Sequence, residues 1–108
     1  MKFGLPQDIV QSIQYIFATS TKVDEVVLFG SRAKGNYKPG SDIDLAVKGS
    51  GLLFDDILSL NVRLDSLDLP YKIDVVNYQT LKDQAVLDHI NRVGITFYKK
   101  NSHFNEVA

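Results

Sequence analysis

The chain has 108 residues, of which 44% are hydrophobic and 23% charged, so it can build one globular domain with an apolar core. With 12 basic and 13 acidic residues its formal net charge is −1, which argues against direct, sequence-independent binding to nucleic acid. It has no cysteine, no signal-peptide pattern and no apolar run near the ~20 residues of a membrane span, which excludes disulfides and favours an intracellular, cytoplasmic protein.

The first half of the chain predicts a helix, a strand, a loop and a second strand. Apolar residues at helical spacing follow Pro6 and predict the helix. Val26–Phe29 is a short apolar run without helical period, which is typical of a buried strand. Residues 35–41 are rich in turn-forming side chains and predict a loop. Residues 42–47 then begin with alternating acidic and apolar side chains, as in a strand with one polar face.

The second half predicts a helix, a strand, a helix and a strand. Leucine and isoleucine recur every three or four residues between positions 53 and 67, which predicts an amphipathic helix. Ile73–Val76 reads as a third strand. Thr80 is expected to cap a last helix over residues 81–92, with Asp83 completing a weakened capping box. The stretch ITFYKK that follows predicts a short edge strand.

This order of elements predicts a single α/β (α+β) domain over residues 1–100, with a small mixed sheet packed against helices. No internal repeat or linker divides it. Residues 101–108 are polar, and we expect them to form a frayed tail.

Three aspartates are the candidate catalytic and metal-binding residues. Asp42 and Asp44 occupy alternate positions of one strand, so their side chains share a face with Cα atoms roughly 6–7 Å apart. Neighbouring carboxylates repel unless a cation lies between them, and Mg²⁺ prefers oxygen ligands. Asp74 lies in another strand and joins the pair if the two strands are neighbours. Three carboxylates can support two Mg²⁺ ions about 3.5–4 Å apart, which is an arrangement suited to in-line phosphoryl displacement.

A Gly-Ser pair at the end of the first strand is the candidate phosphate site. Gly30 has no Cβ, so its backbone can approach a ligand closely. If a short helix begins at Ser31, its N–H groups and hydroxyl can bind the phosphates of a nucleoside triphosphate. We include Arg32 in this predicted site, whereas the sequence leaves open whether Lys34 and Lys38 face the ligand or solvent.

This combination resembles the minimal nucleotidyltransferase (MNT) family of the DNA polymerase β-like superfamily, which carries Gly-Ser, a loop, Asp-x-Asp and a third acidic residue on a later strand. Gly30-Ser31, Asp42, Asp44 and Asp74 match that pattern, within a resemblance over roughly residues 5–100. The resemblance implies the polymerase β-like fold and Mg²⁺-dependent transfer of AMP from ATP with release of pyrophosphate.

Minimal members of this family, of the MntA type, are commonly antitoxins paired with a helical HEPN ribonuclease toxin. The resemblance therefore implies that the acceptor is a tyrosine of such a toxin and that AMP transfer blocks its RNase activity. Two alternatives stay open. The chain could be a binding module that occludes its partner without catalysis, or it could transfer a nucleotide to a small molecule.

The two histidines, His89 and His103, lack cysteine partners and an HxxxH spacing, so we expect neither to bind a metal. The later aromatic residues are expected to pack in the core or at the sheet edge; these are Tyr71, Tyr78, Phe97 and Tyr98.

Overall fold

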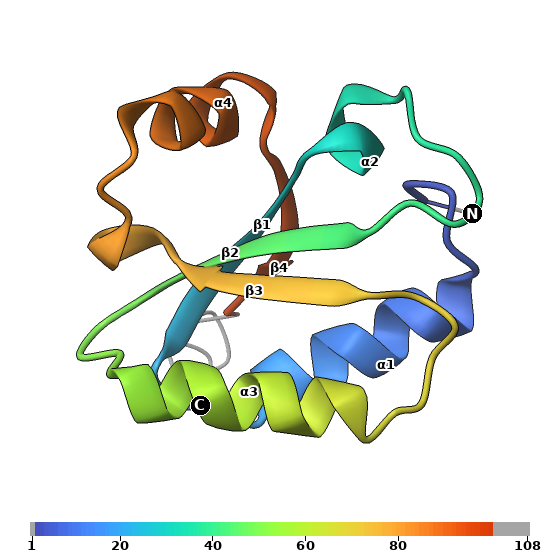
Figure 1. Cartoon of the computed structure of the whole chain (residues 1–108). Helices are drawn as coiled ribbons and strands as arrows, with labels where there is room; N and C mark the ends of the chain where they lie inside the picture. The colour runs from blue at the N-terminus through green and yellow to red at the C-terminus, as the bar shows by residue number, and fades with distance from the viewer. Residues whose placement is uncertain (1, 101–108) are drawn as a thin grey trace, which may run out of the picture.

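The computed structural model describes residues 2–100 and contains a four-stranded mixed sheet with helices on both faces (Figure 1). The predicted order of helices and strands is confirmed, with two short helical turns, α2 and η1, in addition. In chain order the elements are α1 (Gln7–Ala18), β1 (Val23–Phe29), α2 (Ser31–Lys34), β2 (Ile43–Gly49), α3 (Phe54–Asp65), β3 (Ile73–Asn77), η1 (Tyr78–Thr80), α4 (Gln84–Val93) and β4 (Ile95–Lys99).

The sheet order is β3-β2-β1-β4, with β1 antiparallel to both β2 and β4. β2 and β3 run parallel, and α3 forms the crossover between them, as a parallel pair requires. The register places Asp44 opposite Asp74 in the parallel pair and opposite Phe29 in the antiparallel pair. The end of β1 and the starts of β2 and β3 therefore meet at one edge of the sheet.

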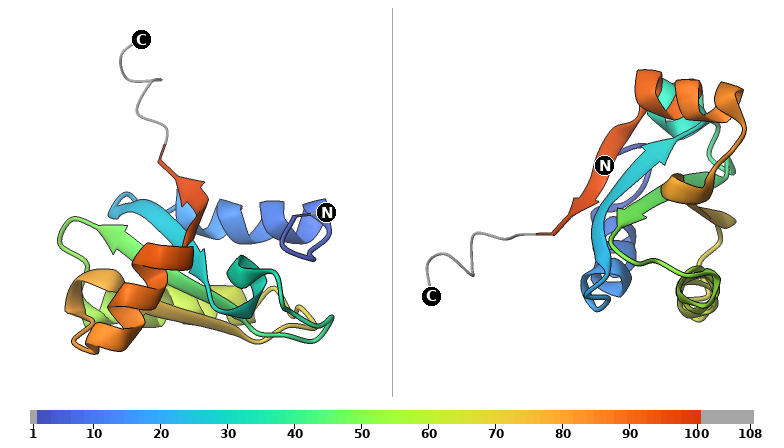
Figure 2. Two further views of the ribbon diagram at one scale, coloured as in Figure 1. Left: turned by 90° about the horizontal axis from the view of Figure 1, so that it is seen from above. Right: turned by 90° about the vertical axis from the view of Figure 1, so that its left-hand side faces the viewer.

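Each strand divides its side chains between the two faces of the sheet. One face, covered by α1 and α3, carries the main core, which includes the fully buried Ile43 and Leu45 of β2. The other face is covered by α4, whose Ile90 packs with Val27 and Ala46 in a smaller apolar cluster. Figure 2 shows α4 on the side of the sheet opposite to α1 and α3. By the alternation of a strand, Asp44 lies on the α4 face.

The predicted start of the last helix is wrong by three residues. Thr80 belongs to η1, and its hydroxyl donates to the carbonyl of Asn77 (3.3 Å), so it does not cap α4. Leu81 is extended, and Asp83 is the actual N-cap, since its side chain accepts hydrogen bonds from the N–H groups of Ala85 and Val86. Thr80 and Asp83 are both favourable N-cap residue types, so the sequence alone does not show which of them begins the helix.

The predicted polar tail, residues 101–108, lies outside the described residues. In residues 2–100, none of the helices combines the length and the hydropathy that crossing a bilayer needs.

Candidate active site

Asp44 and Asp74 occupy facing positions of the parallel strands β2 and β3, so the strand of Asp74 does lie beside that of Asp44. Asp42 comes just before β2 and is exposed, whereas Asp44 and Asp74 are half-buried. The three carboxylates therefore share one edge of the sheet, next to the C-terminal end of β1.

The electrostatics of Asp44 reflect this crowding. Burial raises the pKa of the Asp44 carboxyl above its usual range, and the nearby Asp74 and Asp42 raise this pKa further. The positive charge of Lys72 offsets part of the rise. Burial and two neighbouring negative charges make the ionised form of a carboxylate unfavourable. A cation that binds beside the carboxylate offsets this cost.

Gly30 forms the turn that faces these carboxylates. Its φ of 77° lies in the left-handed region, which favours glycine, and a Cβ at this position would overlap Oδ2 of Asp44. α2 begins at Ser31, the start that the sequence left as a condition, and the N–H of Lys34 donates to the carbonyl of Gly30 (3.1 Å). The Gly-Ser backbone is thus packed directly against the side chain of Asp44.

His89 of α4 also reaches this turn, a contact that no sequence motif predicts. The N–H of Gly30 donates to Nε2 of His89 (3.0 Å), and the imidazole packs edge-on against the ring of Phe29. Gly30 and His89 are 59 positions apart in the sequence. Only the packing of α4 on the sheet brings them together.

Arg32 was expected at the phosphates, but the structure places its guanidinium inside the protein, with only 2% of the residue exposed. It donates hydrogen bonds to three backbone carbonyls and lies 5.3 Å from the centroids of two aromatic rings. The carbonyls belong to Phe3, Pro39 and Ser41, and the rings to Tyr37 and Tyr71. We therefore assign Arg32 to holding the loop of residues 35–41 against the N-terminal segment. Lys34 and Lys38, whose roles the sequence left open, are exposed.

Arg32→Lys should lower the free energy of unfolding by about 3 kcal/mol. The single ammonium group of lysine cannot replace the planar guanidinium, which donates to three carbonyls, so some of these carbonyls lose their hydrogen-bond partner. Urea denaturation measures this loss. Lys34→Arg, an equally conservative change at an exposed position of the same helix, should stay within about 0.5 kcal/mol of wild type. Unchanged stability of Arg32→Lys, with weaker ATP binding, would instead place Arg32 at the phosphates.

The carboxylates do not form a closed metal centre by themselves. In residues 2–100, no group of three or more His, Asp or Glu side chains is arranged to hold a metal ion. The donor set nevertheless fits Mg²⁺, which commonly takes one or two protein carboxylates and completes its shell with phosphate oxygens and water. The facing pair Asp44 and Asp74, with Asp42 nearby, supplies such carboxylates.

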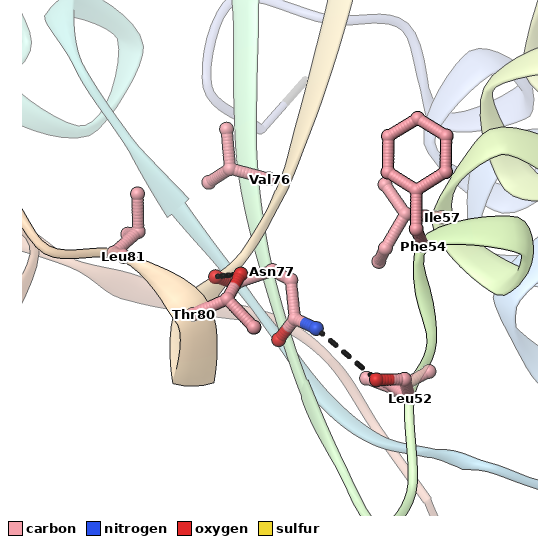
Figure 3. Close-up of a pocket in the computed structure, with 7 residues that line it drawn as sticks. All are labelled: Leu52, Phe54, Ile57, Val76, Asn77, Thr80 and Leu81. Atoms are coloured by element: carbon pink, nitrogen blue, oxygen red, sulfur yellow. Dashed lines mark hydrogen bonds between the residues drawn. The ribbon is translucent and has the colours of Figure 1, made fainter.

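A separate apolar pocket of about 490 Å³ opens at the other end of β3 (Figure 3). It is lined by Leu52, Phe54, Ile57, Val76, Asn77, Thr80 and Leu81. Among these, the side chain of Asn77 donates to the carbonyl of Leu52 (3.5 Å). None of the three aspartates lines this pocket.

Solved structures with similar folds include several toxin–antitoxin complexes. A chain of a toxin–antitoxin complex with AMP-PNP is 21% identical, with a TM-score of 0.66 over 95% of this chain and 80% of that one. A chain from tri-AMPylated Shewanella oneidensis HEPN toxin in complex with MNT antitoxin is 20% identical (TM-score 0.65, 94% and 77% covered). A chain of the toxin–antitoxin MntA–HepT is also 20% identical (TM-score 0.64, 94% and 79% covered). At these identities the likeness shows the fold.

No curated protein matches the sequence. Residues 11–103, however, match the protein family described as "Polymerase beta, Nucleotidyltransferase". This match spans the whole sheet and the edge that carries Asp42, Asp44 and Asp74, which we call the carboxylate edge. The expected polymerase β-like fold is confirmed. The chain therefore belongs to the polymerase β-type nucleotidyltransferase family.

Proposed function

We propose that this chain is a Mg²⁺-dependent nucleotidyltransferase that transfers AMP from ATP to a hydroxyl acceptor. The observation that carries the proposal is the contact between the Gly30 turn and the Asp44 carboxylate, with Asp74 facing Asp44 on the neighbouring strand. A phosphate-binding backbone and a metal-binding carboxylate pair have to be adjacent for a metal to bridge protein and nucleotide.

In this proposal the Gly30-Ser31 turn binds the phosphates, with Gly30 allowing their close approach and Ser31 contacting them, and Asp42, Asp44 and Asp74 hold two Mg²⁺ ions. When bound, the ions would neutralise phosphate charge and lower the pKa of the acceptor hydroxyl. The acceptor oxygen forms a bond to the α-phosphorus while the bond to pyrophosphate breaks. We place Asp74 on the acceptor side, where its carboxylate can also take the hydroxyl proton.

The proposed acceptor is a tyrosine of a HEPN-type RNase toxin, so that the chain acts as an antitoxin. Two of the similar solved structures support this choice, since one is a toxin–antitoxin complex with AMP-PNP and another contains an AMPylated HEPN toxin with its MNT antitoxin. A non-catalytic antitoxin that occludes the toxin is the second candidate. It is favoured by the similar solved structures of toxin–antitoxin complexes, because the formation of a complex is by itself compatible with occlusion.

Incubation with ATP and Mg²⁺, with and without a HEPN-type partner, followed by intact mass spectrometry separates the two candidates. Transfer predicts that the partner gains one or more AMP units and that Asp44→Asn prevents the gain. A stable complex that silences the RNase without any gain in mass, and equally well with Asp42→Asn/Asp44→Asn, would support occlusion instead.

A further inference from the structure

The hydrogen bond between Gly30 and His89 fixes the peptide that precedes α2. Gly30 lies between the end of β1 and the start of α2, so neither the strand ladder nor the helix supplies an acceptor for its N–H. Nε2 of His89 is that acceptor, at 3.0 Å. Because Nε2 accepts, a neutral imidazole in this arrangement carries its proton on Nδ1.

The carbonyl of the same residue is fixed as well, because it accepts the N–H of Lys34 at 3.1 Å. Gly30 has no Cβ to restrict its backbone, and its φ of 77° with ψ of −157° belongs to a region that glycine leaves easily. Two hydrogen bonds therefore hold a residue that would otherwise be free to rotate, and one of them comes from a distant helix.

α4 does not need this hydrogen bond to stay on the sheet. Ile90 is 2% exposed and packs with Val27 and Ala46, and the hydroxyl of Tyr78 donates to Oδ1 of Asn91 (2.7 Å). The contact of His89 with Gly30 is therefore one of several that hold α4 in place, and it is the one hydrogen bond from α4 to the turn in residues 2–100.

We propose that His89 is a positioning residue for nucleotidyl transfer: by accepting the N–H of Gly30, it holds the Gly30-Ser31 turn against Asp44 in the orientation that the triphosphate requires. This inference rests on the proposed function. It also implies that the N–H of Gly30 is engaged within the protein, so that phosphate contacts start with the N–H of Ser31.

Two substitutions of His89 distinguish the loss of the hydrogen-bond acceptor from the loss of side-chain volume. H89Q keeps an oxygen acceptor at about the reach of Nε2, while H89L keeps an apolar side chain without an acceptor. Y78F is the matched control, because it removes another hydrogen bond of α4 and leaves the turn untouched. For each variant, kcat and KM for ATP are measured with the HEPN-type partner. Thermal stability and the hydrogen exchange of the Gly30 amide are measured on the protein alone.

H89L should lower kcat by about tenfold, the effect of one misdirected hydrogen bond, with a smaller change in KM. H89Q should recover most of this loss, and Y78F should lower thermal stability without changing kcat. The Gly30 amide should exchange slowly in wild type and H89Q and rapidly in H89L.

Other outcomes overturn the inference in distinguishable ways. An active wild type with equal kcat in H89L removes the positioning role while the proposed function stands. Equal protection of the Gly30 amide in wild type and H89L shows that another group holds the turn. A folded wild-type protein that neither binds MgATP nor transfers AMP refutes the proposed function, and the positioning role with it.

Discussion

Asp44→Asn is expected to abolish AMP transfer and, at the same time, to raise the free energy of unfolding at neutral pH. Asparagine keeps the shape of the side chain but is a neutral and weaker ligand for Mg²⁺, so transfer should fall by at least about a thousandfold. In the free protein the carboxylate is destabilising when ionised, because burial and the charges of Asp74 and Asp42 raise its pKa. The substitution removes that unfavourable charge.

The stability of the wild-type protein should depend on pH through the same carboxyl group. Because the pKa of Asp44 is higher in the folded than in the unfolded protein, the folded state retains its proton over a window that begins near the ordinary value of about 3.9 and extends upward. Stability therefore falls as pH rises through this window. Asp44→Asn lacks the fall, so its advantage over wild type should be absent at the lowest pH and fully present at pH 7.

Asp56→Asn is the matched control, because it should change the stability at pH 7 in the opposite direction. The hydrogen bond from the N–H of Leu53 and the contact with Lys22 lower the pKa of Asp56. Its stabilising contribution is present above the unfolded pKa and is lost as pH falls, so Asp56→Asn should be less stable than wild type at pH 7. Denaturant unfolding of the three proteins between pH 3 and 7 measures both trends. Lower stability of Asp44→Asn at pH 7 would show that hydrogen bonding to the carboxylate outweighs its burial.

The carboxylate edge was predictable because it depends on local rules. The period of two along a strand predicted that Asp42 and Asp44 share a face, and in the structure β2 begins at Ile43, directly after Asp42. A crossover through an amphipathic helix is the ordinary way to bring the strand of Asp74 alongside. The turn at Gly30 was also predictable, because a strand that ends at Gly-Ser indicates a tight turn.

The contacts of Arg32 and His89 could not be predicted, because each joins distant parts of the chain. A basic residue after Gly-Ser looks like a phosphate ligand in the sequence, but here its partners include the carbonyl of Phe3, 29 positions away. His89 contacts Gly30 because α4 packs across the face of the sheet. Hydrophobic periodicity predicts which side of a helix faces the sheet, but not where along the strands the helix lies.

Gly30→Ala is expected to destabilise the fold and to stop transfer. The left-handed φ of 77° costs an alanine about 1–2 kcal/mol, and its Cβ would overlap Oδ2 of Asp44. Either the turn or the carboxylate must move, so we expect a loss of about 3 kcal/mol in the free energy of unfolding and at least about a hundredfold loss in transfer rate.

Gly35→Ala isolates the backbone contribution to this effect. Gly35 has a φ of 90°, but a Cβ at this position would meet no described atom within 4 Å, so only conformational strain of about 1 kcal/mol is expected. The cycle with Asp44→Ala then tests the overlap itself. The nearest remaining atom of residue 44 would be its Cβ at 3.4 Å, an ordinary contact. In the Asp44→Ala background, Gly30→Ala should therefore cost only the backbone strain of about 1–2 kcal/mol instead of about 3 kcal/mol. An undiminished loss in that background would mean that backbone strain, and not the carboxylate, is what requires glycine beside Asp44.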